Sequence, residues 1–285
     1  SVHGLTFSSY PRRAAPPSMA TEWRSSLALA PVLGSWQDPV DAAIESLAWP
    51  EDAPDPDLVM LVMPRAHASS LQQACAQVAR VLRPGQLLGV VGAGAIGGKE
   101  EVDTDSAVSI LAGVFPAETT LTPFVLAPER MPVWSQLSPG DGDRPAFLLL
   151  ADPFSAVTQA AAALDDAFPS AVVAGGLSCP TSDSVPSLAL GSRGAQCRTL
   201  PVGSVLGLSI RGPNVEVHTA CAQGATPLGP SYEVTSCREN LVLELDGRPA
   251  IERLTEVAQG LQGDERMLKL MRSALLVGVH FPEGE

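Results

Sequence analysis

The stretch that most constrains the fold runs from Ala146 to Gly176 and reads as a strand, a helix and a second strand. Phe147 to Leu150 form an unbroken apolar run, which is typical of a strand covered on both faces. Apolar residues then recur at helical spacing between Val157 and Phe168, and Ala171 to Ala174 form a second short apolar run. The lengths of the apolar runs and the helical spacing between them agree, so these residues predict a strand–helix–strand unit.

Polar residues and glycines punctuate this unit where each strand ends. Asp152 and Pro153 follow the first strand and predict the start of the helix, because Asp caps helices and Pro costs no hydrogen bond at the first helical position. Gly175 and Gly176 end the second strand, where glycine allows a sharp turn or a close approach. Asp152 is also a candidate to bind the ammonium group of a ligand, although capping alone would account for it.

The rest of the chain alternates helices and strands at first and is then dominated by short strands. We therefore expect a mixed α/β fold with mixed sheets and helices on their outer faces, for which a layered α/β/β/α sandwich is one arrangement. Helices are expected from Asp38 to Leu47, from Ser69 or Ser70 to Leu82, from Pro249 to Leu261 and from Glu265 to about Val279; further strands are expected at Leu58–Met63, Leu87–Val91, Ala107–Val114, Phe124–Leu126, Val205–Ile210, Val215–His218 and Leu241–Leu245.

Charge and cysteine content exclude several classes of function. The net charge is −13 at pH 7, which argues against nucleic acid or an anionic membrane surface as a partner. Apolar runs are interrupted well before the roughly 18 residues that a membrane-spanning helix needs. The five cysteines are an odd number without a CxxC pair, so neither a disulfide scaffold nor a zinc site is indicated.

Residues 1–21 differ in composition from the rest of the chain. They contain Arg12 and Arg13, several serines and no acidic residue. This composition is typical of a transit peptide for chloroplasts or another organelle, and a disordered tail is the alternative. Without such a signal the expected location is the cytoplasm.

A glycine-rich turn follows the strand at Leu87–Val91 and resembles a dinucleotide-binding fingerprint. Gly92, Gly94 and Gly97, followed by Gly98, match the GxGxxG pattern. However, residues 99–105 carry several carboxylates and one apolar residue, so they do not predict the helix that such a site requires. A turn that lines a different pocket is the preferred interpretation, and a dinucleotide site stays an alternative.

No catalytic constellation is evident in the sequence. The four histidines are scattered, and none lies near a serine or cysteine in a nucleophile motif. Cys179 follows the Gly175–Gly176 pair and is the most plausible reactive thiol, although small buried cysteines are common. We therefore expect neither an enzyme nor a bound cofactor or metal, with a reactive Cys179 as the alternative.

Several segments together resemble the FIST domain, a sensory domain of bacteria and of some eukaryotic F-box proteins. They are LVMLVM, the GAGAIGG turn, LLLADPFS, VVAGGL, QGATPLGP with VTSCREN, and LELDGRPAIERL, in that order. The resemblance implies an N-terminal FIST-like domain at 38–235 and the start of a C-terminal region at 236–285, which stops soon after its first strand and helix. It also implies sensing of a small ligand, such as an amino acid, and transmission of the signal to a protein partner, without catalytic residues.

The hypothesis from sequence is thus a non-enzymatic module for ligand sensing and signal transduction. Its alternatives are an interaction scaffold or ubiquitin-ligase adaptor, and an enzyme that uses Cys179 or a dinucleotide. The expected ligand-binding residues lie at glycine-rich strand ends and in the rigid loop that begins at Gln223. They are Gly92, Gly94, Gly97, Gly98, Asp152, Gly175, Gly176, Gln223 and Gly224.

Overall fold

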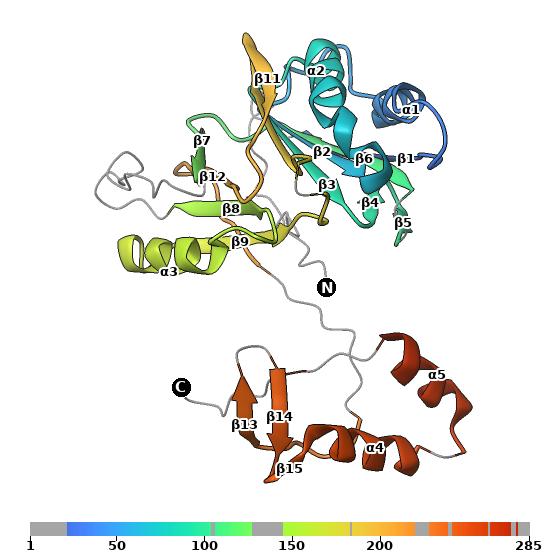
Figure 1. The fold of residues 1–285 in the computed structure, drawn as a ribbon. Helices are drawn as coiled ribbons and strands as arrows, with labels where there is room; N and C mark the ends of the chain where they lie inside the picture. Colours follow the sequence, from blue (N-terminus) through green and yellow to red (C-terminus); the bar gives the residue numbers. More distant parts are fainter. Residues whose placement is uncertain are drawn as a thin grey trace, which may run out of the picture. The chain divides into compact units, whose positions relative to one another are not determined.

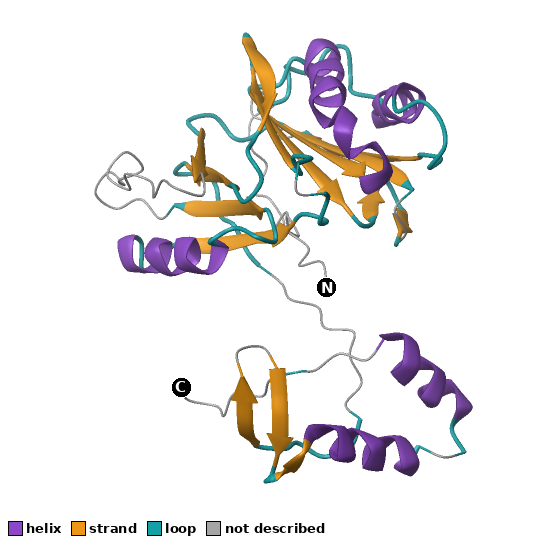
Figure 2. Ribbon diagram, in the orientation of Figure 1, coloured by secondary structure: helices purple, strands orange, loops and turns teal. Residues whose placement is uncertain are grey.

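The structure is a computed structural model that describes residues 22–103, 106–126, 145–182, 184–219, 228–238, 241–261, 263–274 and 278. The chain divides into two compact units, unit 1 (Ser1–Cys221) and unit 2 (Ala222–Glu285). The division falls before the boundary at 235/236 that the sequence suggested. Figures 1 and 2 show the elements of both units.

A six-stranded mixed sheet forms the larger half of unit 1 (Figure 1). Its central strands β2 and β3 are parallel to each other, and the remaining neighbours pair antiparallel. The strand order is β1 (Trp23–Leu29), β6 (Ala107–Gly113), β2 (Leu58–Pro64), β3 (Gln86–Gly92), β10 (Leu188–Ser192) and β11 (Ala195–Thr199).

Two helices cover one face of this sheet. Helix α1 (Gln37–Leu47) buries Val40 and Leu47, and α2 (Leu71–Leu82) buries a stripe that includes Cys75 and Val78. These side chains form one core cluster with residues of β2, β3 and β6. The short helix η1 (Arg65–Ser70) connects β2 directly to α2. The helical spacing of apolar residues in the sequence therefore sets which helix faces meet the sheet.

A four-stranded sheet forms the other half of unit 1. Its order is β7 (Thr120–Leu126), β12 (Val205–Arg211), β8 (Ala146–Ala151) and β9 (Val172–Leu177). Strands β8 and β9 are parallel and are connected by α3 (Val157–Ala167), as the strand–helix–strand pattern predicted. Helix α3 packs on this sheet through Ala160 and Leu164, which contact Phe147 and Phe168 in one cluster.

The two sheets face each other across an apolar core. Leu88 and Val90 of β3 lie in the same buried cluster as Leu148 of β8 and Leu206 and Leu208 of β12. Because α1 and α2 cover the outer face of one sheet and α3 that of the other, unit 1 is a layered α/β/β/α sandwich. Figure 2 shows the helices on the two outer faces. The predicted mixed α/β fold is confirmed.

Unit 2 contains a small antiparallel sheet and two helices. The sheet consists of β13 (Val234–Arg238), β14 (Leu241–Leu245) and β15 (Arg248–Pro249). Helix α4 (Ala250–Gly260) contacts β14, and α5 (Glu265–Ala274) follows it.

Unit 1 also contains a short hairpin, which consists of β4 (Ala95–Gly97) and β5 (Glu100–Val102).

Two local predictions are wrong. Helix α3 begins at Val157 rather than beside Asp152, because the backbone oxygen of Asp152 accepts from the N–H of Ser155 and closes a tight turn first. Val215–His218 do not form a strand. Val215 and Val217 are instead partly buried against the core between the sheets, and an irregular segment can bury alternate side chains without strand pairing.

Candidate functional site

The carboxyl ends of the two parallel strand pairs meet in unit 1. Strands β2 and β3 end at Pro64 and Gly92, and β8 and β9 end at Ala151 and Leu177. Backbone hydrogen bonds join them: Cys179 donates to the oxygen of Val91 at 2.7 Å, and Ser178 donates to the oxygen of Ala151 at 2.8 Å. Ligands commonly bind at such strand ends in open α/β sheets.

Asp152 lies at the centre of this junction and is 3% exposed. Its Oδ2 accepts from the hydroxyl of Ser187 at 2.9 Å, and Ser178 in turn donates to Ser187 at 2.8 Å. Its Oδ1 accepts from the N–H of Phe154 at 3.0 Å. The carboxylate is thus satisfied by internal donors, as buried polar groups generally are.

The network around Asp152 fixes the side chains of Ser178 and Ser187. Ser187 makes two hydrogen bonds that fix its position. Its hydroxyl donates to Asp152, and its backbone oxygen accepts from the N–H of Val91 at 2.9 Å. Farther out, the Thr181 hydroxyl donates to the oxygen of Val185 and the Val185 N–H donates to the oxygen of Ser182. The outer turn of this segment is therefore fixed relative to the end of β3.

A hollow of about 380 Å³ lies between this turn and the helix η1, which follows β2. We call it the carboxyl-end hollow. Its charged group is Arg65, and hydroxyls come from Ser69, Thr181 and Ser182. The full lining is Arg65, Ala66, Ala68, Ser69, Pro180, Thr181, Ser182 and Val185. A cation beside several hydroxyls is suited to a small anionic or zwitterionic ligand.

The glycine-rich turn after β3 packs against protein rather than opening a helix. Gly94 is half-buried, and a Cβ added there would lie 2.8 Å from the oxygen of Val102. A Cβ on Gly97 would collide with the backbone oxygen of Ser26, and Gly98 has φ +61° at the turn of the β4–β5 hairpin. Among residues 92–103 no helix begins, so the helix N-terminus of a dinucleotide site is missing there.

The structure brings together only part of the predicted ligand-binding set. Gly92 and Asp152 lie at the junction of the strand ends, and Gly175 and Gly176 lie near the end of β9. A Cβ on Gly175 would collide with the backbone oxygen of Leu149, whereas one on Gly176 would meet open space. Gln223 and Gly224, like residues 1–21, lie outside the described residues.

The described cysteines do not form a reactive cluster. Burial raises the pKa of Cys75 and of Cys197, so both are thiols at neutral pH. Cys179 is buried, and its backbone N–H is bonded to Val91. In the part of the chain that the structure describes, no cluster of three histidine, cysteine or carboxylate side chains is placed to bind a metal. No described helix has the length and apolarity that crossing a membrane requires.

Fold and site together define a layered α/β/β/α domain with a polar hollow beside its parallel strand ends. Residues 57–248 match the FIST N domain, so the chain belongs to the FIST family of sensor and signal-transduction domains. An uncharacterized protein of Mycobacterium tuberculosis is 30% identical over 232 residues, which cover 79% of this chain and 56% of that protein. An uncharacterized protein of Mycobacterium bovis is 29% identical over 248 residues, which cover 81% of this chain and 59% of that protein. The chain thus spans little more than half the length of these relatives.

Sequence reasoning missed the residues that line the carboxyl-end hollow. Arg65 directly follows the strand LVMLVMP, Ser69 lies later in the short helix η1, and Thr181 and Ser182 follow Cys179-Pro180. Polar residues in the segments that follow strands were therefore the available signal. The glycines were predicted as ligand-binding residues instead, although several of them allow close packing of the backbone.

Proposed function

We propose that this chain is a non-enzymatic sensor module that binds a small carboxylate-bearing ligand, such as an amino acid, in the carboxyl-end hollow. The observation that carries the proposal is the meeting of Arg65 with the hydroxyls of Ser69, Thr181 and Ser182 beside the ends of parallel strands. A volume of about 380 Å³ lies near the lower end of the range for small-molecule sites.

Each lining group has a chemical role in this proposal. The exposed guanidinium of Arg65 presents several N–H donors that match the two oxygens of a carboxylate. The hydroxyls both donate and accept, so they suit the ammonium group and polar side chain of an amino acid. Ala66, Ala68 and Val185 supply the apolar surface that such a ligand also contacts.

Asp152 is a positioning residue in this proposal. Its carboxylate is bonded to Ser187 and Phe154 and is not among the residues that line the hollow. By fixing Ser187 it holds the turn that contains Thr181 and Ser182. The hollow would then lose its shape when this network is broken, even though Asp152 itself does not touch the ligand.

The test is a thermal-shift panel of amino acids and dinucleotides on the full chain. A ligand that binds only the folded state raises Tm in a concentration-dependent manner. We expect a shift with one class of amino acid that Arg65→Gln removes and that the control Arg198→Gln, an exposed arginine of β11, retains. A shift with dinucleotides alone, or a shift that both variants retain equally, would contradict the proposal.

One observation supports an interaction scaffold as a second candidate. In unit 2 the apolar side chains of Val234, Leu241 and Ile251 are each more than half exposed. Exposed apolar side chains mark an interaction surface where they belong to one patch. Sedimentation velocity over a concentration series would detect self-association, which Leu241→Ser should reduce if this surface is responsible.

A further inference from the structure

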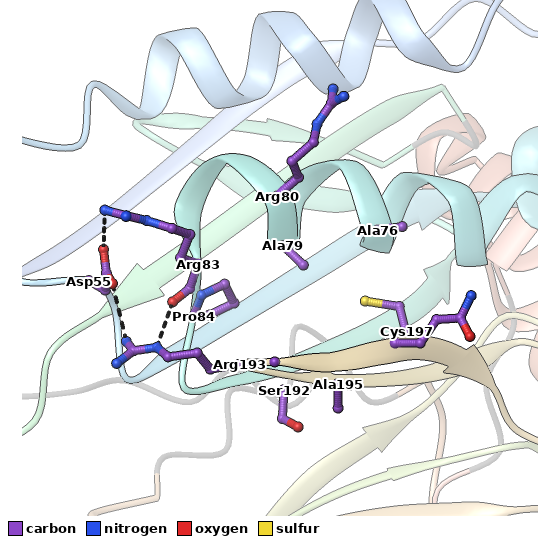
Figure 3. Close-up of a pocket in the computed structure, with 12 residues that line it drawn as sticks. Asp55, Ala76, Ala79, Arg80, Arg83, Pro84, Ser192, Arg193, Ala195 and Cys197 are labelled. Atoms are coloured by element: carbon purple, nitrogen blue, oxygen red, sulfur yellow. Dashed lines mark hydrogen bonds and ion pairs between the residues drawn. The ribbon is translucent and has the colours of Figure 1, made fainter.

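We propose that unit 1 has a second binding site, for a small organic anion, at the C-terminal end of α2. A hollow of about 540 Å³ lies there between the last turns of α2 and the β10–β11 hairpin (Figure 3). We call it the arginine hollow, because Arg80, Arg83 and Arg193 line it together with a single carboxylate, Asp55. It shares no lining residue with the carboxyl-end hollow, so this proposal does not depend on the proposed function.

Two of these arginines converge on Asp55. Nη2 of Arg83 lies 2.9 Å from Oδ1 of Asp55, and Nη2 of Arg193 lies 3.6 Å from Oδ2. The arginine side chains are 69% and 57% exposed, whereas that of Asp55 is 31% exposed. Each guanidinium therefore keeps further N–H donors directed to solvent, where an added anion can bind.

The local charge of the arginine hollow has the opposite sign to that of the chain. The whole chain carries −13, yet three arginines and one carboxylate line this hollow. Arg80 extends from α2 away from the Asp55 pair in Figure 3, so it contributes at the rim. A positive concave site on an acidic protein attracts anions locally while the surrounding surface repels them.

The hairpin holds the arginine hollow open at a fixed geometry. Nε of Arg193 donates to the backbone oxygen of Arg83 at 3.2 Å, and the backbone N–H of Arg193 donates to the oxygen of Gly85 at 3.3 Å. Farther along, Nε2 of Gln72 donates to the backbone oxygen of Cys197 at 3.1 Å. Such preorganised groups lose little entropy when a ligand binds.

The remaining lining indicates which anion fits. Ala76, Ala79, Pro84 and Ala195 supply apolar surface, and Ser192 and Gln196 are the polar residues among the rest. The Cys197 thiol adds to it, because burial raises its pKa and keeps it neutral. The site therefore suits a molecule with an apolar body and an oxyanion head, either a carboxylate or a phosphate.

The effect of substituting Asp55 distinguishes an anion-binding site from an ion-pair cluster that only stabilises the fold. In a binding site, Asp55 competes with the ligand anion for the same two guanidiniums. Asp55→Asn should then tighten anion binding by about five-fold, the equivalent of about 1 kcal/mol for one exposed ion pair. In a structural cluster, the same substitution would free the arginines without creating a saturable site.

The experiment follows the arginine Nε–H signals by NMR while inorganic phosphate or butyrate is added to the full chain at constant ionic strength. We expect saturable shifts of the Arg83 and Arg193 signals, stronger binding in Asp55→Asn and at least a ten-fold loss in Arg193→Gln. Arg198→Gln, an exposed arginine that lines neither hollow, should bind as the wild type does. Binding of butyrate alone identifies a carboxylate ligand, and binding of phosphate alone identifies a phosphate ligand. Binding of neither at millimolar concentration, or weaker binding in Asp55→Asn, would overturn the proposal.

Discussion

The Ser187 hydroxyl donates a 2.9 Å hydrogen bond to Oδ2 of Asp152, and both side chains are buried. Asp152 follows β8 of the four-stranded sheet, whereas Ser187 precedes β10 of the six-stranded sheet. One hydrogen bond thus joins the two sheets at the ends of their parallel strands. It also fixes the turn that lines the carboxyl-end hollow.

Asp152→Ala should destabilise the chain by about 2–3 kcal/mol, because it leaves the Ser187 hydroxyl and the Phe154 N–H without their buried acceptor. Urea denaturation measures the loss in the free energy of unfolding. The control is Asp165→Ala on the exposed face of α3, which should change that free energy by less than about 0.5 kcal/mol. Equal effects of the two substitutions would show that the Asp152 network contributes no specific stability.

Gly175→Ala and its neighbour Gly176→Ala should differ sharply. A Cβ at Gly175 would collide with the backbone oxygen of Leu149, whereas the space around Gly176 is open. We expect a loss of about 1–3 kcal/mol for the first, as for overpacking in general, and little change for the second. Thermal unfolding of both variants under one set of conditions gives the comparison, and a tolerated Gly175→Ala would contradict the close packing of β9 on β8.

Alkylation of the native chain should label the exposed Cys237 well before Cys75, Cys179 and Cys197, which are buried. The thiolate is the reactive form, and burial opposes it by raising the pKa of Cys75 and Cys197. Peptide mass spectrometry after timed iodoacetamide treatment gives the order. If Cys179 reacted fastest of all, this result would support an enzyme that uses Cys179 and would contradict the non-enzymatic proposal.

Stability should decrease at alkaline pH because of Cys75. Burial raises its pKa above the ordinary value of 9.0, so the folded state keeps a proton that the unfolded state releases. The stabilising contribution is complete below pH 9 and is lost as the pH rises toward the folded-state pKa, by at most about 1.4 kcal/mol per pH unit. Urea denaturation between pH 8 and about pH 10 should give a shallower slope for Cys75→Ala than for the wild type. Parallel slopes would refute this linkage.

The strand–helix–strand unit was predictable from sequence because its strands are long apolar runs and its helix has a clear period. Strand β1 (Trp23–Leu29) was not predicted, because WRSSLAL contains polar residues that an edge strand tolerates. Strands β10 and β11 were also missed, since LALGS and AQCRT combine small and polar residues of weak strand preference. The pairing of β10 with β3, and of β11 with β10, depends on tertiary context rather than on local pattern.

The candidate site was predictable only in its general location. Strand ends were the expected place, and Gly92 and Asp152 do lie at the junction. The roles of individual residues were not predictable, because contacts between Asp152 and Ser187 span 35 positions of the chain. Arg65 and Thr181 likewise line one hollow only because the two sheets pack together.

The most direct test of the central claim is a two-dimensional ¹H–¹⁵N NMR titration with the amino acid that gives the largest thermal shift. We expect saturable shifts of the backbone N–H signals of the non-proline residues that line the carboxyl-end hollow, namely Arg65, Ala66, Ala68, Ser69, Thr181, Ser182 and Val185. Arg65→Gln should abolish those shifts at the same ligand concentration. Saturable shifts confined to other parts of the chain would contradict the assignment of the carboxyl-end hollow as the ligand site.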